Sequence, residues 1–416
     1  MARQFNRDLQ YYKFCTYGFL KNLNFFEPFF VLFFLEKGMT FLEIGTLYSI
    51  GQIATNILEI PTGVAADALG RRRTMIYSFI SYIISFLIFY FATSYTLCAV
   101  AMIFWAFGEA FRTGTHKAMI FEYLKIKGWL DQKVHYYGRT RASSQMGSAL
   151  SALIAAAIVF YSGSYRLIFL YSTIPYFLDL LLMITYPKEL DGHLEAFKTE
   201  KVKETILRVI KDFIISFKDK LMLKAIANLS FYTGYYNAAK DFLQPILESF
   251  ALGLPIFITL QGKQRSALVI GFVYFILYFL TSLASRHAGN FADKYKGLCL
   301  LLNTTMMIGY MAGLISGLLI ILGVPFLAIL AYMFIYLIEN LRKPMGISYV
   351  SDMMKHDILA TALSAESQTS TLIAAILAPI IGFFADKWGV GYAIAFVSLL
   401  MILPAPLYFA KKKSRA

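Results

Sequence analysis

The sequence predicts an all-α membrane protein with twelve transmembrane helices, arranged as two pseudo-symmetric six-helix bundles. Its 416 residues are 58% hydrophobic and only 15% charged, whereas soluble domains carry roughly 25% charged residues. No Asp, Glu, Lys or Arg occurs at 74–108 or at 298–338. Each stretch can supply more than one crossing, since a spanning helix needs about 20 apolar residues. The third observation is an internal repeat, described below.

Window length and charge boundaries predict the spans in chain order. They cover 14–35, 44–66, 74–93, 96–124, 136–161, 166–186, 222–247, 266–290, 298–321, 324–350, 358–385 and 390–410. The long polar segment 187–221 separates an N-terminal bundle, 1–186, from a C-terminal bundle, 222–416. Within it, apolar residues from Val202 to Phe217 recur at helical spacing, which fits either an amphipathic helix on the inner leaflet or a solvated linker helix.

The net charge of +14 records orientation in the membrane, and we do not expect a nucleic-acid partner. Cations cluster at alternate ends of the apolar runs, as in proteins that obey the positive-inside rule. The clusters are Arg71–Arg73, Lys125–Arg141, Lys188–Lys224, Lys294 with Lys296, and Lys411–Arg415. This asymmetry predicts a multi-pass protein of the cytoplasmic (inner) membrane with both termini in the cytoplasm. The N-terminus carries no signal-peptide pattern.

The two halves resemble each other in four places, each about 220–230 residues apart and in the same order. "NFFEPFF" in the first span matches "DFLQPIL" in the seventh, and "FGEAFRTGT" in the fourth matches "LIENLRKPM" in the tenth. "SSQMGSALSALIAA" in the fifth matches "ESQTSTLIAAILA" in the eleventh, and "GVAADALGRRR" is echoed by "GNFADKYKG". Such a six-plus-six repeat predicts a site between the halves, near the middle of the bilayer.

The stretch "GVAADALGRRR" lies at the cytoplasmic end of the second span. We expect Gly63 to allow two helices to approach closely and Gly70 to let the chain reverse without steric penalty. Asp67 can face a helix N-terminus or pair with a loop arginine. A charged latch of this kind can hold the two halves closed on one side and break when they move.

The spacing G-x-x-x-D-x-x-G-[RK]-[RK] resembles the loop motif of the major facilitator superfamily. The first copy matches at Gly63, Asp67, Gly70, Arg71 and Arg72, although Ala68 stands where the family usually has a basic residue. The second copy keeps Gly289 and Asp293, and a third partial copy, "GFFADKWG", ends the eleventh span on the outer side. The resemblance covers essentially the whole chain and implies transport by alternating access, without implying a substrate.

Ionisable side chains inside the spans are candidates for function, because each costs about 2.5–3.5 kcal/mol at the bilayer centre. The resemblance implies that the first, fourth, seventh and tenth spans line a central cavity. The predicted substrate and proton cavity consists of Asn24, Glu27, Glu109, Arg112, His116, Gln145, Lys240, Asp241, Glu339 and Arg342.

In the functional interpretation, Arg112, Lys240 and Arg342 bind an anionic substrate, since an arginine fork suits a carboxylate or phosphate. Glu27, Glu109 or Asp241 would carry the coupling proton. Alternatively, Glu109–Arg112 and Glu339–Arg342 are ion pairs within their own helices, because residues at this spacing are neighbours on a helix surface. His116 can move protons or serve as an interior packing residue.

These patterns predict a secondary transporter that moves a small organic solute by alternating access. Proton-coupled efflux by an antiporter is placed first, and proton-coupled or exchange transport of an organic anion is the alternative. A transporter-like receptor or scaffold without transport is the alternative of another class. We expect a monomer in the bilayer, with a small-molecule substrate and protons as the coupling ion. No enzyme motif, cofactor or metal site is expected.

Overall fold

The computed structural model describes residues 7–129, 132–191, 204, 207, 220–255, 258–294, 297–353 and 356–410, and the regular secondary structure in this part is helical. The all-helical fold class is therefore confirmed. The predicted amphipathic segment at 202–217 lies, apart from 204 and 207, outside the described residues.

The described residues of the first half form long α-helices with short 3₁₀ helices between them. They are α1 (Leu9–Lys21), η1 (Glu27–Phe29), α2 (Phe30–Glu36), α3 (Phe41–Leu69), α4 (Arg71–Phe91), α5 (Tyr95–Arg112), α6 (Thr115–Ile126), α7 (Lys133–Ser162), α8 (Leu167–Ile184) and η3 (Lys188–Asp191). The second half contains α10 (Lys220–Ala239), η4 (Lys240–Phe242), α11 (Leu243–Gly253), α12 (Gly262–Lys294), α13 (Leu298–Ile321), α14 (Pro325–Met353), α15 (His356–Trp388), α16 (Val390–Ile402) and η5 (Ala405–Tyr408).

Each of the twelve predicted spans coincides with a helix or with a broken pair of helices. Eight helical segments in the described part of the chain are long and apolar enough to cross a membrane, and they correspond to spans three to six and eight to eleven. The remaining four spans correspond to α1 with η1 and α2, to α3, to α10 with η4 and α11, and to α16 with η5.

Four of the predicted spans are interrupted where continuous helices were expected; the twelfth ends as α16 at Ile402 and is followed by the short η5. The first is broken between Lys21 and Glu27, and the seventh contains η4, so the breaks fall at the matching sequences "NFFEPFF" and "DFLQPIL". The fourth ends at Arg112 and restarts at Thr115 after Gly114, which has a φ of 78°. Glycine adopts this left-handed conformation at little cost, and the break changes the direction in which the flanking side chains point.

By its internal contacts the chain forms two compact units. The first comprises Met1–Phe29, Ala54–Thr205 and Gly271–Tyr278, and the second comprises Phe30–Ile53, Ile206–Ile270 and Phe279–Ala416. The domain boundaries 1–186, 187–221 and 222–416 remain a prediction.

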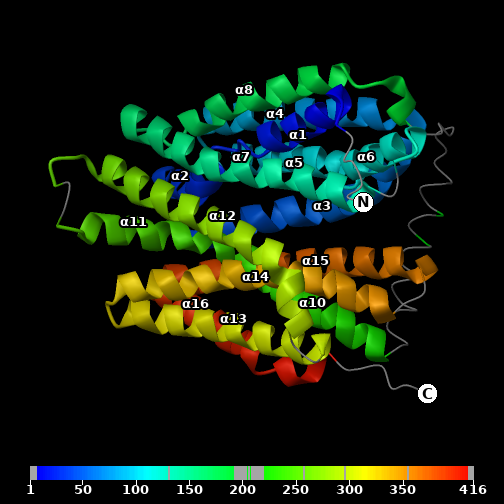
Figure 1. The fold of residues 1–416 in the computed structure, drawn as a ribbon. Helices are drawn as coiled ribbons and strands as arrows, with labels where there is room; N and C mark the ends of the chain where they lie inside the picture. The colour runs from blue at the N-terminus through cyan, green and yellow to red at the C-terminus, as the bar shows by residue number, and fades with distance from the viewer. Residues whose placement is uncertain are drawn as a thin grey trace. The chain divides into compact units, whose positions relative to one another are not determined.

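The same helix pairs pack together within each unit, as expected for an internal repeat. In the first unit α4 packs on α5 and α8, and α1 packs on α7 and α8; in the second, α13 packs on α14 and α16, and α10 packs on α15 and α16. Within each unit these neighbours can be followed in Figure 1.

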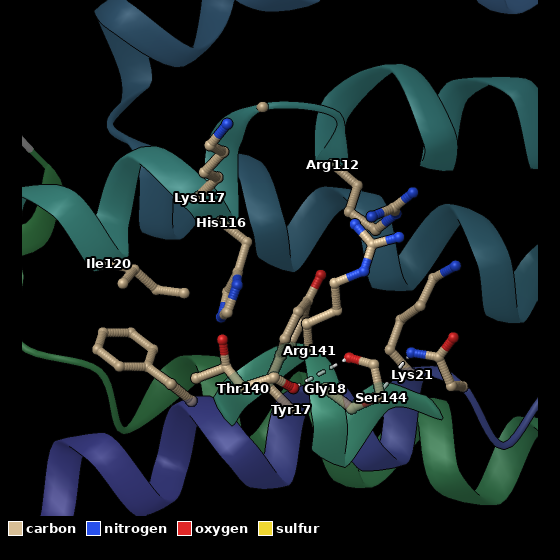
Figure 2. A pocket seen from close by; sticks show the side chains of 13 residues that line it. Tyr17, Gly18, Lys21, Arg112, His116, Lys117, Ile120, Thr140, Arg141 and Ser144 are labelled. Carbon is tan, nitrogen blue, oxygen red and sulfur yellow. Dashed lines mark hydrogen bonds between the residues drawn. The ribbon is translucent and has the colours of Figure 1, made fainter. Parts of the chain in front are cut away.

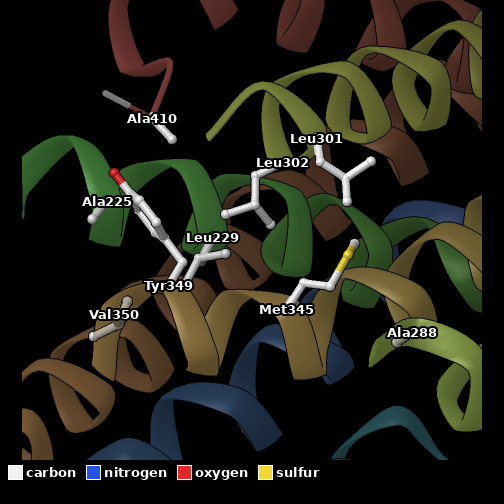
Figure 3. Close-up of a cluster of buried hydrophobic side chains, with 9 residues drawn as sticks. All are labelled: Ala225, Leu229, Ala288, Leu301, Leu302, Met345, Tyr349, Val350 and Ala410. Carbon is white, nitrogen blue, oxygen red and sulfur yellow. The ribbon is translucent and has the colours of Figure 1, made fainter. Parts of the chain in front are cut away.

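The second unit has an apolar core where α10, α12, α13 and α14 meet (Figure 3). Its buried members are Ala225, Leu229, Ala288, Leu301, Leu302, Met345, Tyr349, Val350 and Ala410. Large apolar side chains also lie on the outside of the helices, for example Phe91, Phe272 and Leu403. An exposed apolar surface of this kind suits a protein whose surroundings are lipid.

Candidate functional site

A pocket opens in the first unit between α1, the turn that joins α5 to α6, and α7 (Figure 2). Its volume is about 240 Å³. Thirteen residues line it: Phe14, Tyr17, Gly18, Lys21, Asn22, Arg112, Gly114, His116, Lys117, Ile120, Thr140, Arg141 and Ser144.

Four of the lining side chains are cationic, and none is an aspartate or glutamate. Lys21 comes from α1, Arg112 from the end of α5, Lys117 from α6 and Arg141 from α7. Figure 2 shows the charged ends of Lys21, Arg112 and Arg141 extending toward the same part of the pocket. No carboxylate of the described residues lies within ion-pair distance of Arg141. The pocket therefore has the charge that an anion requires.

Glu109 lies beside the pocket and holds two of these cations. Its Oε2 is 2.6 Å from Arg112 Nη2, and its Oε1 is 3.5 Å from Lys21 Nζ. Arg112 also donates from Nε to the Tyr82 hydroxyl at 3.1 Å. The expected Glu109–Arg112 ion pair is confirmed. Because the contacts fix the guanidinium from one side, a ligand can meet an arginine that is already oriented.

The pocket depends on a close approach of α1 and α7. A Cβ atom on Gly18 would lie 2.6 Å from Ser144 Oγ and 2.9 Å from the Thr140 carbonyl oxygen, and one on Gly147 would lie 2.4 Å from the Phe19 carbonyl oxygen. The two glycines thus let the helices cross at a distance that larger residues would prevent.

His116, another lining residue, is held in place by contacts with its neighbours. Its ring stacks on Tyr17, with ring centroids 3.6 Å apart, and its Nε2 is 3.3 Å from the Tyr186 hydroxyl. That hydroxyl donates to the Lys13 carbonyl oxygen at 3.3 Å, so the histidine belongs to a connected set of contacts between α1, α6 and the end of α8. These contacts favour the packing role for His116.

The other residues predicted for the cavity in the first unit lie outside the lining set. Asn24 donates from Nδ2 to Glu27 Oε2 at 2.8 Å, in the segment that interrupts the first span. Gln145 is half-buried on α7, next to Ser144. The pocket thus brings together Arg112 and His116 of the predicted set, with Glu109 in contact. A turn separates Arg112 from His116, because α5 ends at Arg112 and α6 begins at Thr115.

Lys21, Lys117 and Arg141 were missed by the sequence interpretation. Arg141 was counted in a cytoplasmic cluster that reports membrane orientation, although it lies on the first turns of α7. Lys21 ends α1 at the break in the first span. A cation at the end of an apolar helix, six residues before the candidate Glu27, was the available signal.

The predicted cavity residues of the second unit are engaged in contacts within that unit. Lys240 Nζ is 3.0 Å from Asp241 Oδ1 in η4. Glu339 accepts hydrogen bonds from the Thr233 hydroxyl, at 3.1 Å to Oε1 and 3.3 Å to Oε2. Their assignment to a substrate cavity stays a prediction.

Arg342 is only 2% exposed, and its partners are neutral. It donates to the carbonyl oxygen and Oδ1 of Asn228 at 3.1 and 2.9 Å, to Thr305 Oγ1 at 3.1 Å and to the Leu302 carbonyl oxygen. Its guanidinium carbon lies 4.9 Å from the centre of the Tyr232 ring. The alternative in which Glu339 and Arg342 form an ion pair is wrong, because the carboxylate and the guanidinium have these other partners.

Residues of the loop motif contact the ends of neighbouring helices. Gly70 has a φ of 93°, as its expected turn role requires. The Arg72 backbone N–H donates to Asp191 Oδ1 at 2.7 Å, and Arg71 Nη1 is 3.6 Å from Glu122 Oε2. The side chains of Asp67 and Asp293 lie outside the described residues.

Gly63 differs from expectation. A Cβ atom on Gly63 would meet no atom within 4 Å, so no helix in the described part of the chain approaches closely there, and the same is found at Gly289 in the second copy. In the third partial copy, Asp386 accepts hydrogen bonds from the backbone N–H groups of Phe41, at 2.7 Å, and Leu42, at 2.8 Å. It therefore caps the N-terminus of α3. Among the described residues, no group of three His, Cys, Asp or Glu side chains is placed to hold a metal.

Comparison with known proteins gives the family. The family model described as "Major Facilitator Superfamily" matches residues 14–365. The chain is 25% identical over 398 residues to the uncharacterized MFS-type transporter YxaM of Bacillus subtilis (strain 168), covering 92% of this chain and 90% of that protein.

Solved structures agree with the fold. A crystal structure of a mutant of the nucleoside transporter NupG matches with a TM-score of 0.77 at 17% identity, over 97% of this chain and all of that one. A POT family transporter in complex with a thioalcohol-conjugated peptide matches with a TM-score of 0.74 at 14% identity, over 96% of this chain and 95% of that one.

Proposed function

The chain belongs to the major facilitator superfamily of secondary transporters, and we propose that it moves a small organic anion across the membrane by alternating access. The observation that carries this proposal is the pocket of the first unit, which four cations and no carboxylate line. Arginine side chains bind carboxylate and phosphate groups through two parallel hydrogen bonds. Glu109 pairs with Arg112 and Lys21, so one carboxylate faces four cations, and an anionic substrate would offset the remaining positive charge.

The size of the pocket favours a small anion over a large amphipathic compound. Its volume of about 240 Å³ lies below the roughly 300–1,000 Å³ of pockets that enclose drug-sized ligands. Phe14, Tyr17 and Ile120 add aromatic and apolar groups to the lining. An anion that carries a short apolar or aromatic part fits both kinds of group. We therefore place organic-anion transport ahead of efflux of amphipathic compounds.

Alternating access requires contacts that form in one state and break in the other. The cap that Asp386 places on α3 is a candidate for an outer gate, because two hydrogen bonds to a helix N-terminus can be exchanged for water when helices move. Protons are the proposed coupling ion. The proposed location is the cytoplasmic membrane, with both termini inside and the protein active as a monomer.

The test is ligand binding by the purified protein. Ligand binding raises the temperature of unfolding in a way that depends on ligand concentration. We expect benzoate, succinate or glycerol phosphate to stabilise the protein, whereas glycerol and choline should have no effect. The stabilisation should weaken in Arg112→Ala and Arg141→Ala. Arg166→Ala is the matched control, because Arg166 packs over Tyr90 outside the pocket.

Equal stabilisation by glycerol or choline would contradict the proposal, as would unchanged anion binding in both pocket variants. Transport is then measured in proteoliposomes with the anion that binds best. Binding without any uptake or exchange of that anion would favour a receptor over a transporter.

A further inference from the structure

A carboxyl group that the site does not use is enclosed in the first unit. Asp179 lies on α8 and is 0% exposed. Neither Oδ1 nor Oδ2 has a hydrogen-bond partner among the described residues. A buried, ionised carboxylate that accepts no hydrogen bond carries a large desolvation cost. The neutral, protonated form is therefore the one that this position accommodates.

Other buried polar groups near Asp179 also lack hydrogen-bond partners. The hydroxyl groups of Tyr17 and Tyr176 are also buried without a hydrogen-bond partner among the residues that the structure describes. Such a cluster of orphaned polar atoms in a packed interior calls for an explanation. A proton on Asp179 adds a donor to a set of atoms that otherwise has two carboxylate acceptors without a partner.

Helices α1, α4 and α7 pack against α8. Lys21 of α1 acts electrostatically on Asp179. Asp179 in turn acts on the hydroxyl groups of Tyr17 of α1, Tyr176 of α8 and Tyr186 beyond the end of α8. Tyr82 of α4 packs its ring against Tyr176 at 5.3 Å. No charged side chain of α7 in the described part of the chain acts on Asp179, so Lys21 is the cation whose charge reaches it.

Two of these neighbours also line the anion pocket. Tyr17 and Lys21 belong both to the pocket and to the surroundings of Asp179. The charge of Asp179 therefore influences the anion through Lys21. An ionised Asp179 would partly offset the positive charge of Lys21, whereas a protonated Asp179 would not. The positive potential in the pocket is therefore higher when Asp179 is protonated.

The other candidate carboxylates already have partners. Glu109 is paired with Arg112 and Lys21, Asp241 with Lys240, and Glu27 accepts from Asn24. Nearby cations and donors favour the charged form of a carboxylate. Asp179 differs from all three, because no described residue donates a hydrogen bond to either of its carboxylate oxygens.

We propose that Asp179 is the proton-binding residue that couples transport to a proton gradient, with Lys21 as the link to the anion. A proton from water binds one carboxylate oxygen, and Lys21 then supports anion binding. Loss of that proton restores the negative charge beside Lys21 and weakens anion binding. By linkage, the bound anion favours the proton to the same extent, so proton and anion move in the same direction. This inference rests on the proposed anion transport.

The first experiment detects the proton itself and needs no substrate. Infrared difference spectra of the purified protein, recorded across neutral pH, should contain the carbonyl band of a protonated carboxyl group. The band should disappear in Asp179→Asn and remain in Glu59→Gln, a matched change of a carboxylate on α3. An unchanged band in Asp179→Asn would overturn the inference. If that variant does not fold, Asp179→Glu retains the carboxyl group and should shift the band.

The second experiment measures coupling in proteoliposomes, with the anion that stabilises the wild-type protein best. A pH gradient should drive accumulation of the anion by the wild type but not by Asp179→Asn. Exchange of internal for external anion, which needs no net proton movement, should persist in the variant. Accumulation by Asp179→Asn at the wild-type level would show that the proton binds elsewhere. If the wild type neither accumulates nor exchanges an anion, the proposed function fails, and the infrared result still decides whether Asp179 binds a proton.

Discussion

Glu109 and Arg112 on α5 occupy the same place in the repeat as Glu339 and Arg342 on α14, yet the two pairs make different contacts. The Arg112 side chain is 27% exposed, pairs with Glu109 and lines the pocket. Arg342 is 2% exposed and binds backbone and neutral side-chain oxygens. Arg112 has an exposed side that a ligand can contact, whereas Arg342 is enclosed by its hydrogen-bond acceptors on neighbouring helices.

The backbone explains the difference. After Arg112 the helix ends, because Gly114 adopts a left-handed conformation. After Arg342 the helix continues through Pro344 to Met353, and Arg342 reaches acceptors on α10 and α13. We therefore propose that the duplicated sequence carries a binding role in one unit and a structural role in the other. The following predictions test that assignment.

The largest effect is expected on removing the buried arginine. Arg342→Ala should lower the free energy of unfolding by about 3 kcal/mol or more, because several buried acceptors lose their donor at about 1–3 kcal/mol each. Thermal unfolding in detergent measures the change. Arg112→Ala is the matched control and should unfold near the wild-type temperature. A stable Arg342→Ala protein that no longer binds anions would reverse the assignment.

Removing the pocket arginine should affect binding instead of stability. Arg112→Ala should raise the Kd for the best anion roughly 10- to 100-fold, about 1.4–2.8 kcal/mol, since hydrogen bonds to charged groups contribute about 1.5–3 kcal/mol. Isothermal titration calorimetry measures the affinity. Arg112→Lys should recover only part of it, because lysine lacks the planar fork. An unchanged Kd in Arg112→Ala would place the anion elsewhere.

The partner carboxylate in the same unit should act in the opposite direction. Glu109→Gln removes the negative charge that pairs with Arg112 and Lys21, so the pocket becomes more positive. Anion affinity should rise about two- to fivefold, since partly exposed ion pairs contribute up to about 1 kcal/mol. The gain should shrink at high salt. A loss of affinity would mean that Glu109 chiefly holds the two cations in position.

The sequence predicted the fold well, because charge-free windows and positive clusters report membrane crossings directly. The helix interruptions at 22–26, 113–114 and 240–242 were not predicted. A window of about 20 residues is too long to reveal a break of a few residues. Local signals were present in Pro28 and Gly114. Their effect depends on packing that composition does not describe.

The site was predicted in part. Arg112 stood out as a cation inside an apolar run, whereas Arg141 was hidden in a cluster that also reports orientation. Asp179 is the only ionisable residue between Arg166 and Lys188, apart from tyrosines, and a lone intramembrane carboxylate is itself a signal of function. Which charges share a pocket depends on how α1, α5, α6 and α7 cross, and a single sequence does not reveal that.

The smallest effect on stability and anion affinity is expected for Glu339→Gln, the counterpart of Glu109→Gln in the second unit. Glu339→Gln keeps an oxygen that can accept from the Thr233 hydroxyl, so the free energy of unfolding should change by less than about 1 kcal/mol. Because Glu339 lies in the other unit and its hydrogen bonds go to Thr233, the Kd for the anion should stay at the wild-type value, in contrast to the gain in Glu109→Gln. Calorimetry and thermal unfolding of the two glutamine variants, measured side by side, check both statements. A tenfold change of affinity in Glu339→Gln, about 1.4 kcal/mol, would show that the second copy of the sequence also takes part in binding, and the two copies would then share one role.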